Sequence, residues 1–120
     1  MDAEQQLFDL SLLEQMSDKS FIKQVIDIYL QDASIDMLEI KKAFITGDQE
    51  TVHKKAHKVK SSTGMLKANA LYNLLTDIEK TAKTGLDNSQ LSGLIEQSIL
   101  SFNLLQAALL LHLQELQPVA

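Results

Sequence analysis

The sequence contains no cysteine and no arginine, and only 1 proline and 4 glycines interrupt its 120 residues. The lack of cysteine excludes disulfides, thiolate metal ligands and a cysteine nucleophile. The lack of arginine removes the side chain that binds phosphates and bases through two parallel hydrogen bonds. Because proline and glycine mark the turns of sheet proteins, their scarcity argues against a many-stranded sheet.

Charge and hydropathy further limit the kind of protein that this sequence can encode. The formal charge of -5 argues against general affinity for nucleic acid, and a hydrophobic fraction of 45% is enough for one core. We therefore expect a single domain over residues 1–120. The first residues contain no basic leader ahead of an apolar stretch, so no signal peptide is expected. The most apolar segment, from Ile99 to Leu113, contains Ser101, Asn103 and Gln106. Since a membrane span needs about 20 apolar residues, we predict a buried helix there and no membrane insertion.

Apolar residues recur at helical spacing almost throughout the chain, and no period-2 strand is convincing. We expect a short helix over Asp9–Met16 and a long second helix capped by Ser17 or Asp18 and stopped at Gly47. A third helix is expected from Asp48 to Leu66, a fourth from Ala68 to Thr84, and a last one capped by Ser89 and ending before Pro118. The positions expected to face the core are, helix by helix, Leu10, Leu13 and Met16; Phe21, Val25, Ile28, Ile35 and Leu38; Val52, Ala56, Val59, Thr63 and Leu66; Ala68, Leu71, Leu75, Ile78 and Ala82; and Leu91, Ile95, Phe102, Leu105, Leu109 and Leu116. Short connections between such helices predict an all-α fold, an antiparallel four-helix bundle with a short extra N-terminal helix.

The third helix carries the strongest chemical signal. His57 falls about 140° from Val52 on a helical wheel, so the imidazole is expected to face solvent. Ser61 and Gly64, one and two turns further on, are small and leave the ring open to another protein. From Thr51 to Thr76 there is no acidic residue, whereas five lysines are present, at Lys54, Lys55, Lys58, Lys60 and Lys67. We expect a local positive patch suited to a phosphoryl group, with a mostly neutral imidazole as the nucleophile.

The segment from Ala56 through His57 and Lys60 to Ala68 resembles the signature of histidine-containing phosphotransfer (HPt) domains. In that signature an Ala-His pair is followed by Leu-Lys-Gly-Ser-like residues and later by a Gly. The resemblance implies that His57 is the phosphoacceptor and that Lys60 neutralises the phosphoryl group. Ser61 and Lys67 stand where the family usually has Gly. Lys54, Lys58, Ser61 and Gly64 are then expected to form the face on which a partner docks.

The same resemblance implies a phosphocarrier without an ATP site rather than an enzyme. A receiver domain would donate the phosphoryl group from a phosphoaspartate, and another receiver would accept it. The receiver supplies the aspartate and Mg²⁺, so no cofactor is expected on this chain. The implied partners are receiver domains and a hybrid sensor histidine kinase, and the chain is expected to be a cytoplasmic monomer. The cognate kinase, the response regulator, the output, and whether the chain is free-standing all stay open.

Simpler interpretations of the same residues remain. His57 could be an ordinary surface histidine, and the protein a non-phosphorylated adaptor that binds a partner through a bundle face. A nucleic-acid-binding bundle using the lysine face is disfavoured by the acidity of the chain and the absence of arginine. His53 and His57 are one turn apart, but a third ligand is missing and Lys54 stands where a zinc peptidase needs Glu. His112 is interpreted as a satisfied core or bundle-edge histidine, and Asp77 and Glu79 as carboxylates without the burial or pairing of an acid or base.

Overall fold

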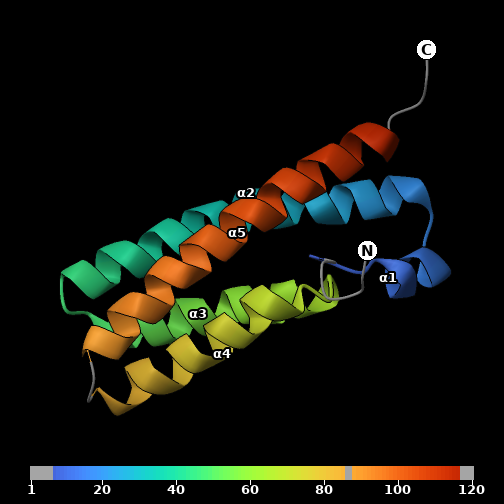
Figure 1. Cartoon of the computed structure of the whole chain (residues 1–120). Helices are drawn as coiled ribbons and strands as arrows, with labels where there is room; N and C mark the ends of the chain where they lie inside the picture. Colours follow the sequence, from blue (N-terminus) through green and yellow to red (C-terminus); the bar gives the residue numbers. More distant parts are fainter. Residues whose placement is uncertain (1–6, 86–87, 117–120) are drawn as a thin grey trace.

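The structure is a computed structural model, and it describes residues 7–85 and 88–116. These residues form five helices and no strand: α1 (Ser11–Met16), α2 (Lys19–Ile45), α3 (Gln49–Met65), α4 (Asn69–Thr84) and α5 (Asn88–Leu116). The four long helices lie side by side, and α1 lies at the end of the bundle where α2 begins (Figure 1). The predicted four-helix bundle with a short extra N-terminal helix is confirmed.

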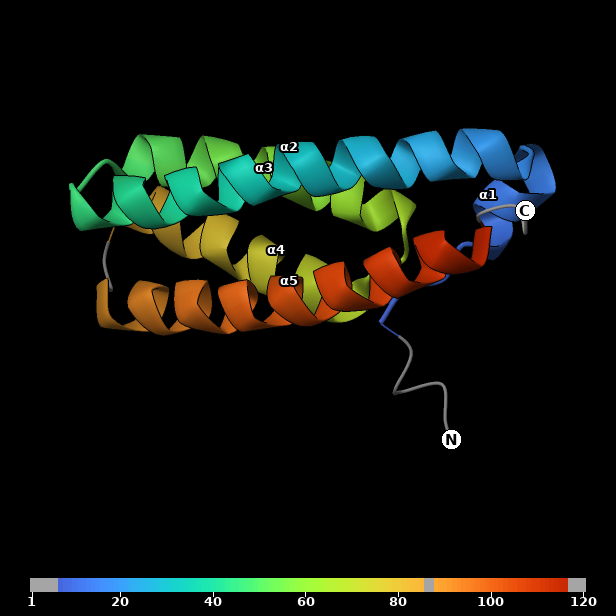
Figure 2. The ribbon, with the colours of Figure 1, turned by 90° about the horizontal axis from the view of Figure 1, so that it is seen from above.

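Within the described helices, α3 packs on α2 and α4, and α5 packs on the same two neighbours. The view from above shows α2 and α3 along one side of the bundle and α4 and α5 along the other (Figure 2). Helices α3 and α5 therefore occupy diagonal corners of the bundle, and their outward faces point in opposite directions. This arrangement separates the face that carries His57 from the outer face of α5.

The predicted helix boundaries are mostly confirmed by their caps. The carboxylate of Asp18 accepts a hydrogen bond from the backbone N–H of Phe21 at 2.9 Å, and that of Asp48 accepts one from Thr51 at 3.1 Å. Such caps satisfy N–H groups that have no partner within the helix. Ser89 is not a cap, because α5 begins at Asn88. Residues 86–87 and Pro118 lie outside the described residues.

Lys67 ends α3 in an unusual conformation for a side chain other than glycine. Its φ is 54°, in the left-handed region that glycine adopts without steric penalty. The backbone turns sharply here, and α4 folds back antiparallel on α3.

The core contains every residue predicted for α3 and α4. Val52, Ala56 and Val59 on α3 are at most 1% exposed. On α5 the predicted stripe is also buried, except that Leu116 is half-buried. The buried hydroxyls of Tyr29 and Thr63 bond to each other at 2.7 Å, and burial raises the pKa of Tyr29 to about 12.

The predicted stripe of α2 is wrong. Phe21, Ile28, Ile35 and Leu38 are all exposed, and Val25 is half-buried. Met16 of α1 is exposed too. The residues of α2 that face the core are Ile22, Ile26, Tyr29, Leu30, Ala33, Asp36, Met37, Ile40 and Ala43. The predicted stripe lies about a third of a turn away from this one, because α2 carries apolar residues on two sides.

Helix α5 is long and apolar enough to cross a membrane by length and composition alone. The core helices of soluble proteins pass the same test, so this is weak evidence of a span. In the structure α5 is a bundle helix, with seven residues buried against α2 and α4: Leu91, Ile95, Ser98, Phe102, Leu105, Leu109 and Leu113.

Candidate functional site

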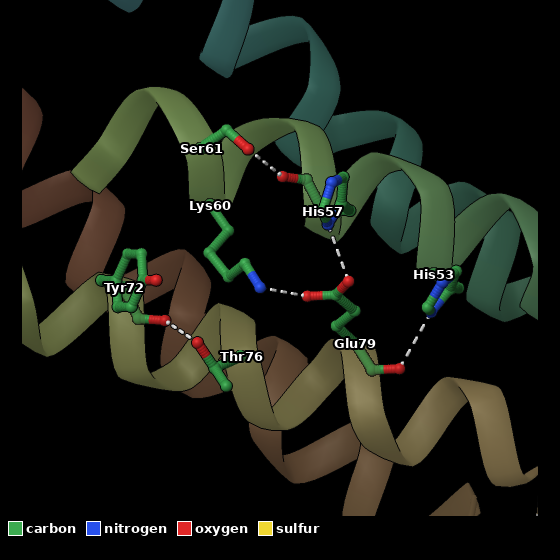
Figure 3. A network of polar contacts seen from close by, with 7 residues as sticks. All are labelled: His53, His57, Lys60, Ser61, Tyr72, Thr76 and Glu79. Atoms are coloured by element: carbon green, nitrogen blue, oxygen red, sulfur yellow. Dashed lines mark hydrogen bonds and ion pairs between the residues drawn. The ribbon is translucent and has the colours of Figure 1, made fainter. Parts of the chain in front are cut away.

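His57 lies on the outer face of α3, and its side chain is 61% exposed, whereas Ala56 beside it is fully buried. Because α4 folds back on α3 at Ala68, residues equally far from that turn face each other. His57 thus meets Glu79, and the imidazole Nδ1 lies 2.8 Å from the Glu79 Oε2 atom. The other carboxylate oxygen of Glu79 lies 2.7 Å from the Lys60 ammonium. One carboxylate therefore joins His57 to Lys60 (Figure 3).

This contact determines which ring nitrogen of His57 can react. An ionised carboxylate can only accept hydrogen bonds, so the facing Nδ1 of the imidazole must carry a proton and donate. In the neutral ring the lone pair is then on Nε2. The site presents a nucleophilic nitrogen on an exposed ring whose other nitrogen is held in place.

Glu79 is suited to this role because its carboxylate is ionised and only 16% exposed. Partial burial acts to raise the pKa of Glu79, but the hydrogen bonds and positive charge of Lys60, with those of His57, outweigh it and lower the pKa. The hydrogen bond to Glu79 in turn raises the pKa of Lys60. The interpretation of Glu79 as unpaired is wrong. Its position opposite His57 across the α3–α4 turn was the signal that could have identified it.

His53 also bonds to Glu79, one turn before His57 on α3. Its Nδ1 lies 3.0 Å from the backbone carbonyl oxygen of Glu79, which can only accept, so this nitrogen donates. His53 and His57 thus contact different oxygens of the same residue (Figure 3). Among the described residues, no group of three or more His, Asp or Glu side chains is arranged to hold a metal ion.

The predicted positive patch is largely neutralised by carboxylates that come from elsewhere in the fold. Lys58 lies 3.0 Å from Asp36 of α2, and Lys55 lies 2.8 Å from Glu39 of the same helix. Lys54 pairs with Glu50 within α3 at 3.3 Å. The positive charge of this patch is therefore smaller than the run of lysines predicts. Lys54 and Lys58 remain well exposed and can still exchange these partners for another carboxylate.

Ser61 and Gly64 differ in accessibility. Ser61 is exposed, and its hydroxyl donates to the backbone carbonyl of His57 at 3.2 Å. Gly64 is half-buried, and a Cβ atom added there would lie 3.2 Å from the ring of Tyr72. Gly64 thus lets Tyr72 of α4 lie against α3. The placement of Gly64 on a freely exposed face is corrected.

An apolar groove beside α3, the helix that carries His57, could not be recognised from sequence periodicity. It lies between α2 and α3 and has a volume of about 270 Å³. Ile28 and Met65, which are 58% and 52% exposed, line it together with Val25, and Lys58 and Asp36 are also among its lining residues. Ile28 had been assigned to the core. Only the orientation of α2 in the bundle reveals that it borders the His57 helix.

Comparison with known proteins is consistent with this geometry. The chain resembles the crystal structure of histidine-containing phosphotransfer protein B (HptB) from Pseudomonas aeruginosa PAO1, with a TM-score of 0.85 and 19% identity. The match covers 92% of this chain and 97% of that chain, and at this identity it shows the fold alone. No match was found among curated protein sequences. The family model of the Hpt domain matches residues 24–117, a range that includes His57, Lys60 and Glu79. The chain therefore belongs to the Hpt domain family, the phosphocarriers of phosphorelays.

Proposed function

We propose that His57 accepts a phosphoryl group from the phosphoaspartate of one receiver domain and passes it to the aspartate of another. The observation that carries this proposal is the exposed imidazole whose Nδ1 donates to the largely buried, ionised carboxylate of Glu79 at 2.8 Å. A surface histidine without a role would not need a buried carboxylate to hold its ring.

In the first transfer, the Nε2 lone pair of His57 attacks phosphorus and a P–N bond forms. The P–O bond to the receiver aspartate breaks, and its electron pair leaves with the carboxylate. Because Nδ1 keeps its proton, the ring becomes positively charged, and the negative charge of Glu79 stabilises it. The second transfer reverses these steps, since the P–N bond breaks and the ring leaves as neutral imidazole.

Lys60 is proposed to stabilise the phosphoryl oxygens. Its ammonium already binds the carboxylate that holds His57, so it lies in the same cluster of charges. When His57 is phosphorylated, the ammonium can be shared between Glu79 and the phosphoryl group. Its raised pKa keeps it charged across the neutral range.

The proposed docking face joins the lysines predicted from sequence to the apolar groove. Lys54, Lys58 and Ser61 surround His57 on α3, and Ile28 with Met65 adds apolar contact area toward α2. Interfaces combine such an apolar centre with a charged rim. We propose that receiver domains, including that of a hybrid sensor kinase, bind here in the cytoplasm. The receiver is expected to supply the aspartate and Mg²⁺, and this chain is expected to need no ATP site and no cofactor of its own.

The test is incubation of the full chain with a panel of phosphorylated receiver domains, followed by measurement of acid-labile phosphate. We expect transfer that is abolished by His57→Gln. The matched control is His53→Gln, which changes a histidine one turn away that also bonds to Glu79. Phosphate on the wild type and on His53→Gln supports the proposal. Binding of receivers without any acid-labile phosphate would contradict it and favour the adaptor interpretation.

A further inference from the structure

The outward face of α5 carries an aliphatic stripe that has no role in the core or in the His57 site. Leu100, Leu104 and Leu111 are 65%, 61% and 60% exposed, and Ala107 between them is also exposed. On a helical wheel these four residues lie within about 30° of one line, directly opposite the buried stripe. No charged residue occurs between Glu96 and Glu115. A continuous apolar stripe of this kind on a soluble domain marks a contact surface.

The spacing of the stripe is the same in both chain directions. From Leu100 the steps are four, three and four residues, through Leu104 and Ala107 to Leu111. A second copy of α5 laid antiparallel would place Leu100 opposite Leu111 of that copy. Leu104 would lie opposite the small Ala107, so that a large side chain fills the space left by a small one. We propose that this face of α5 binds the same face of a second copy and forms an antiparallel, two-fold symmetric dimer.

The residues at the ends of the stripe are compatible with the antiparallel orientation. Gln97 and Gln114 extend the stripe by one turn at each end, and Glu96 and Glu115 flank it on opposite sides. In an antiparallel pair each glutamate approaches a glutamine of the other copy, which can donate a hydrogen bond to it. A parallel pair would instead bring Ala107 next to Ala107, which leaves a gap in the contact.

A lipid surface fits this stripe less well than a second copy does. Helices that lie on membranes carry Lys or Arg along their polar face to contact anionic headgroups. Helix α5 contains no basic residue other than His112, and the charges at the edges of its stripe are carboxylates. The geometry also keeps the dimer compatible with docking at His57, because α3 and α5 occupy diagonal corners of the bundle (Figures 1 and 2).

The contact is expected to be reversible. From Gln97 to Gln114 the stripe is about 26 Å long, and one helix face offers less than the roughly 800 Å² per partner of a standard stable interface. Association should therefore depend on concentration. This expectation replaces the monomer that the sequence alone suggested.

The test is sedimentation equilibrium of the full chain at concentrations up to about 1 mM, the upper end of weak association. We expect the wild type to approach twice the monomer mass and Leu104→Glu to stay monomeric at every concentration. The matched control is Leu38→Glu, because Leu38 is 65% exposed on α2 and lies outside the stripe. It should dimerise like the wild type, and all three should melt at similar temperatures. A monomeric wild type, or equal loss of association in both variants, would overturn the proposal.

The orientation has a separate test, since the chain contains no native cysteine. Gln97→Cys and Gln114→Cys are oxidised alone and as a mixture. An antiparallel dimer cross-links only in the mixture, where the two different variants meet. Cross-linking of either variant with itself would overturn the antiparallel arrangement. Sedimentation of a monomeric wild type with anionic phospholipid vesicles, lost in Leu104→Glu, would instead assign the stripe to membranes. Phosphotransfer by Leu104→Glu should equal that of the wild type, so this proposal and the phosphotransfer proposal can fail independently.

Discussion

The carboxylate of Glu79 is expected to accelerate phosphotransfer by stabilising positive charge on the His57 ring. The substitution Glu79→Gln tests this directly, because the amide oxygen can still accept the hydrogen bond from Nδ1 while the negative charge is removed. The ring therefore keeps its orientation, and only its electrostatic stabilisation changes. Glu79→Ala removes both and should have the larger effect.

The magnitude follows from the geometry of the site. Two unit charges about 4 Å apart interact by about 1 kcal/mol in water and about 4 kcal/mol at the dielectric typical of a protein surface. The His57 side chain is 61% exposed, and Lys60 compensates part of the Glu79 charge. We therefore expect the Glu79 carboxylate to stabilise the charged His57 ring by about 1–2 kcal/mol. This energy corresponds to a reduction of roughly 5- to 30-fold in the transfer rate.

The assay is single-turnover transfer from a phosphorylated receiver, followed by decay of the isolated phosphohistidine. Glu79→Gln should slow transfer onto His57 and speed transfer from phosphohistidine to a receiver, because the ring gains its positive charge in the first step and loses it in the second. The matched control is Glu50→Gln, which removes the same charge from an exposed residue that pairs only with Lys54 in the structure. Unchanged transfer in Glu79→Gln, or an equal reduction in Glu50→Gln, would refute the role assigned to Glu79.

Four further outcomes are expected. Lys60→Ala should slow transfer or shorten the phosphohistidine lifetime without unfolding the bundle; if both match the wild type, the role belongs to Lys58 or Lys54. Ser61→Phe should abolish transfer with little change in melting temperature, because Ser61 is exposed beside His57. Ser61→Gly should transfer normally. Normal transfer by Ser61→Phe would show that receivers dock elsewhere. Val59→Asp should unfold the domain, since Val59 is 1% exposed and burying an unpaired charge costs several kcal/mol; a cooperative melt near that of the wild type would contradict this. Because the pKa of Glu79 is lowered from 4.5, its contribution to stability is fully present above pH 4.5 and is lost as the pH falls through the lowered pKa. On acidification the melting temperature of the wild type should therefore fall more than that of Glu79→Gln.

The parts of the fold that the sequence predicted best are those whose helices have one apolar face. On α3 and α4 the buried and exposed positions separate cleanly, so the predicted core residues Val52, Ala56, Leu71 and Leu75 are all buried. The exposure of His57 follows from the same periodicity. For these helices the pattern determines both the presence of the helix and its rotation about its axis.

The periodicity of α4 alone does not identify Glu79, because its pairing with His57 depends on how α4 folds back on α3. Its burial arises from packing of α4 on α3, and its ionisation is maintained by Lys60 and His57. The positive charge of the lysine segment was overestimated for the same reason. A segment without acidic residues is not a positive surface when Asp36 and Glu39 approach it from another helix.

The errors on α2 and the unexplained residues of α5 have one physical cause. Each of these helices carries more apolar side chains than one core-facing stripe can bury, so apolar residues also occur on its outer face, and on α2 they led to the wrong stripe. The surplus residues are then found outside the core, at Ile28 beside the His57 helix and at Leu104 on the opposite corner of the bundle. The stability of a monomeric bundle does not require an exposed apolar side chain at either position. Apolar residues that a helix cannot bury in its own domain are candidates for contact with another protein, and here they lie on the two surfaces proposed for receiver docking and for dimer formation.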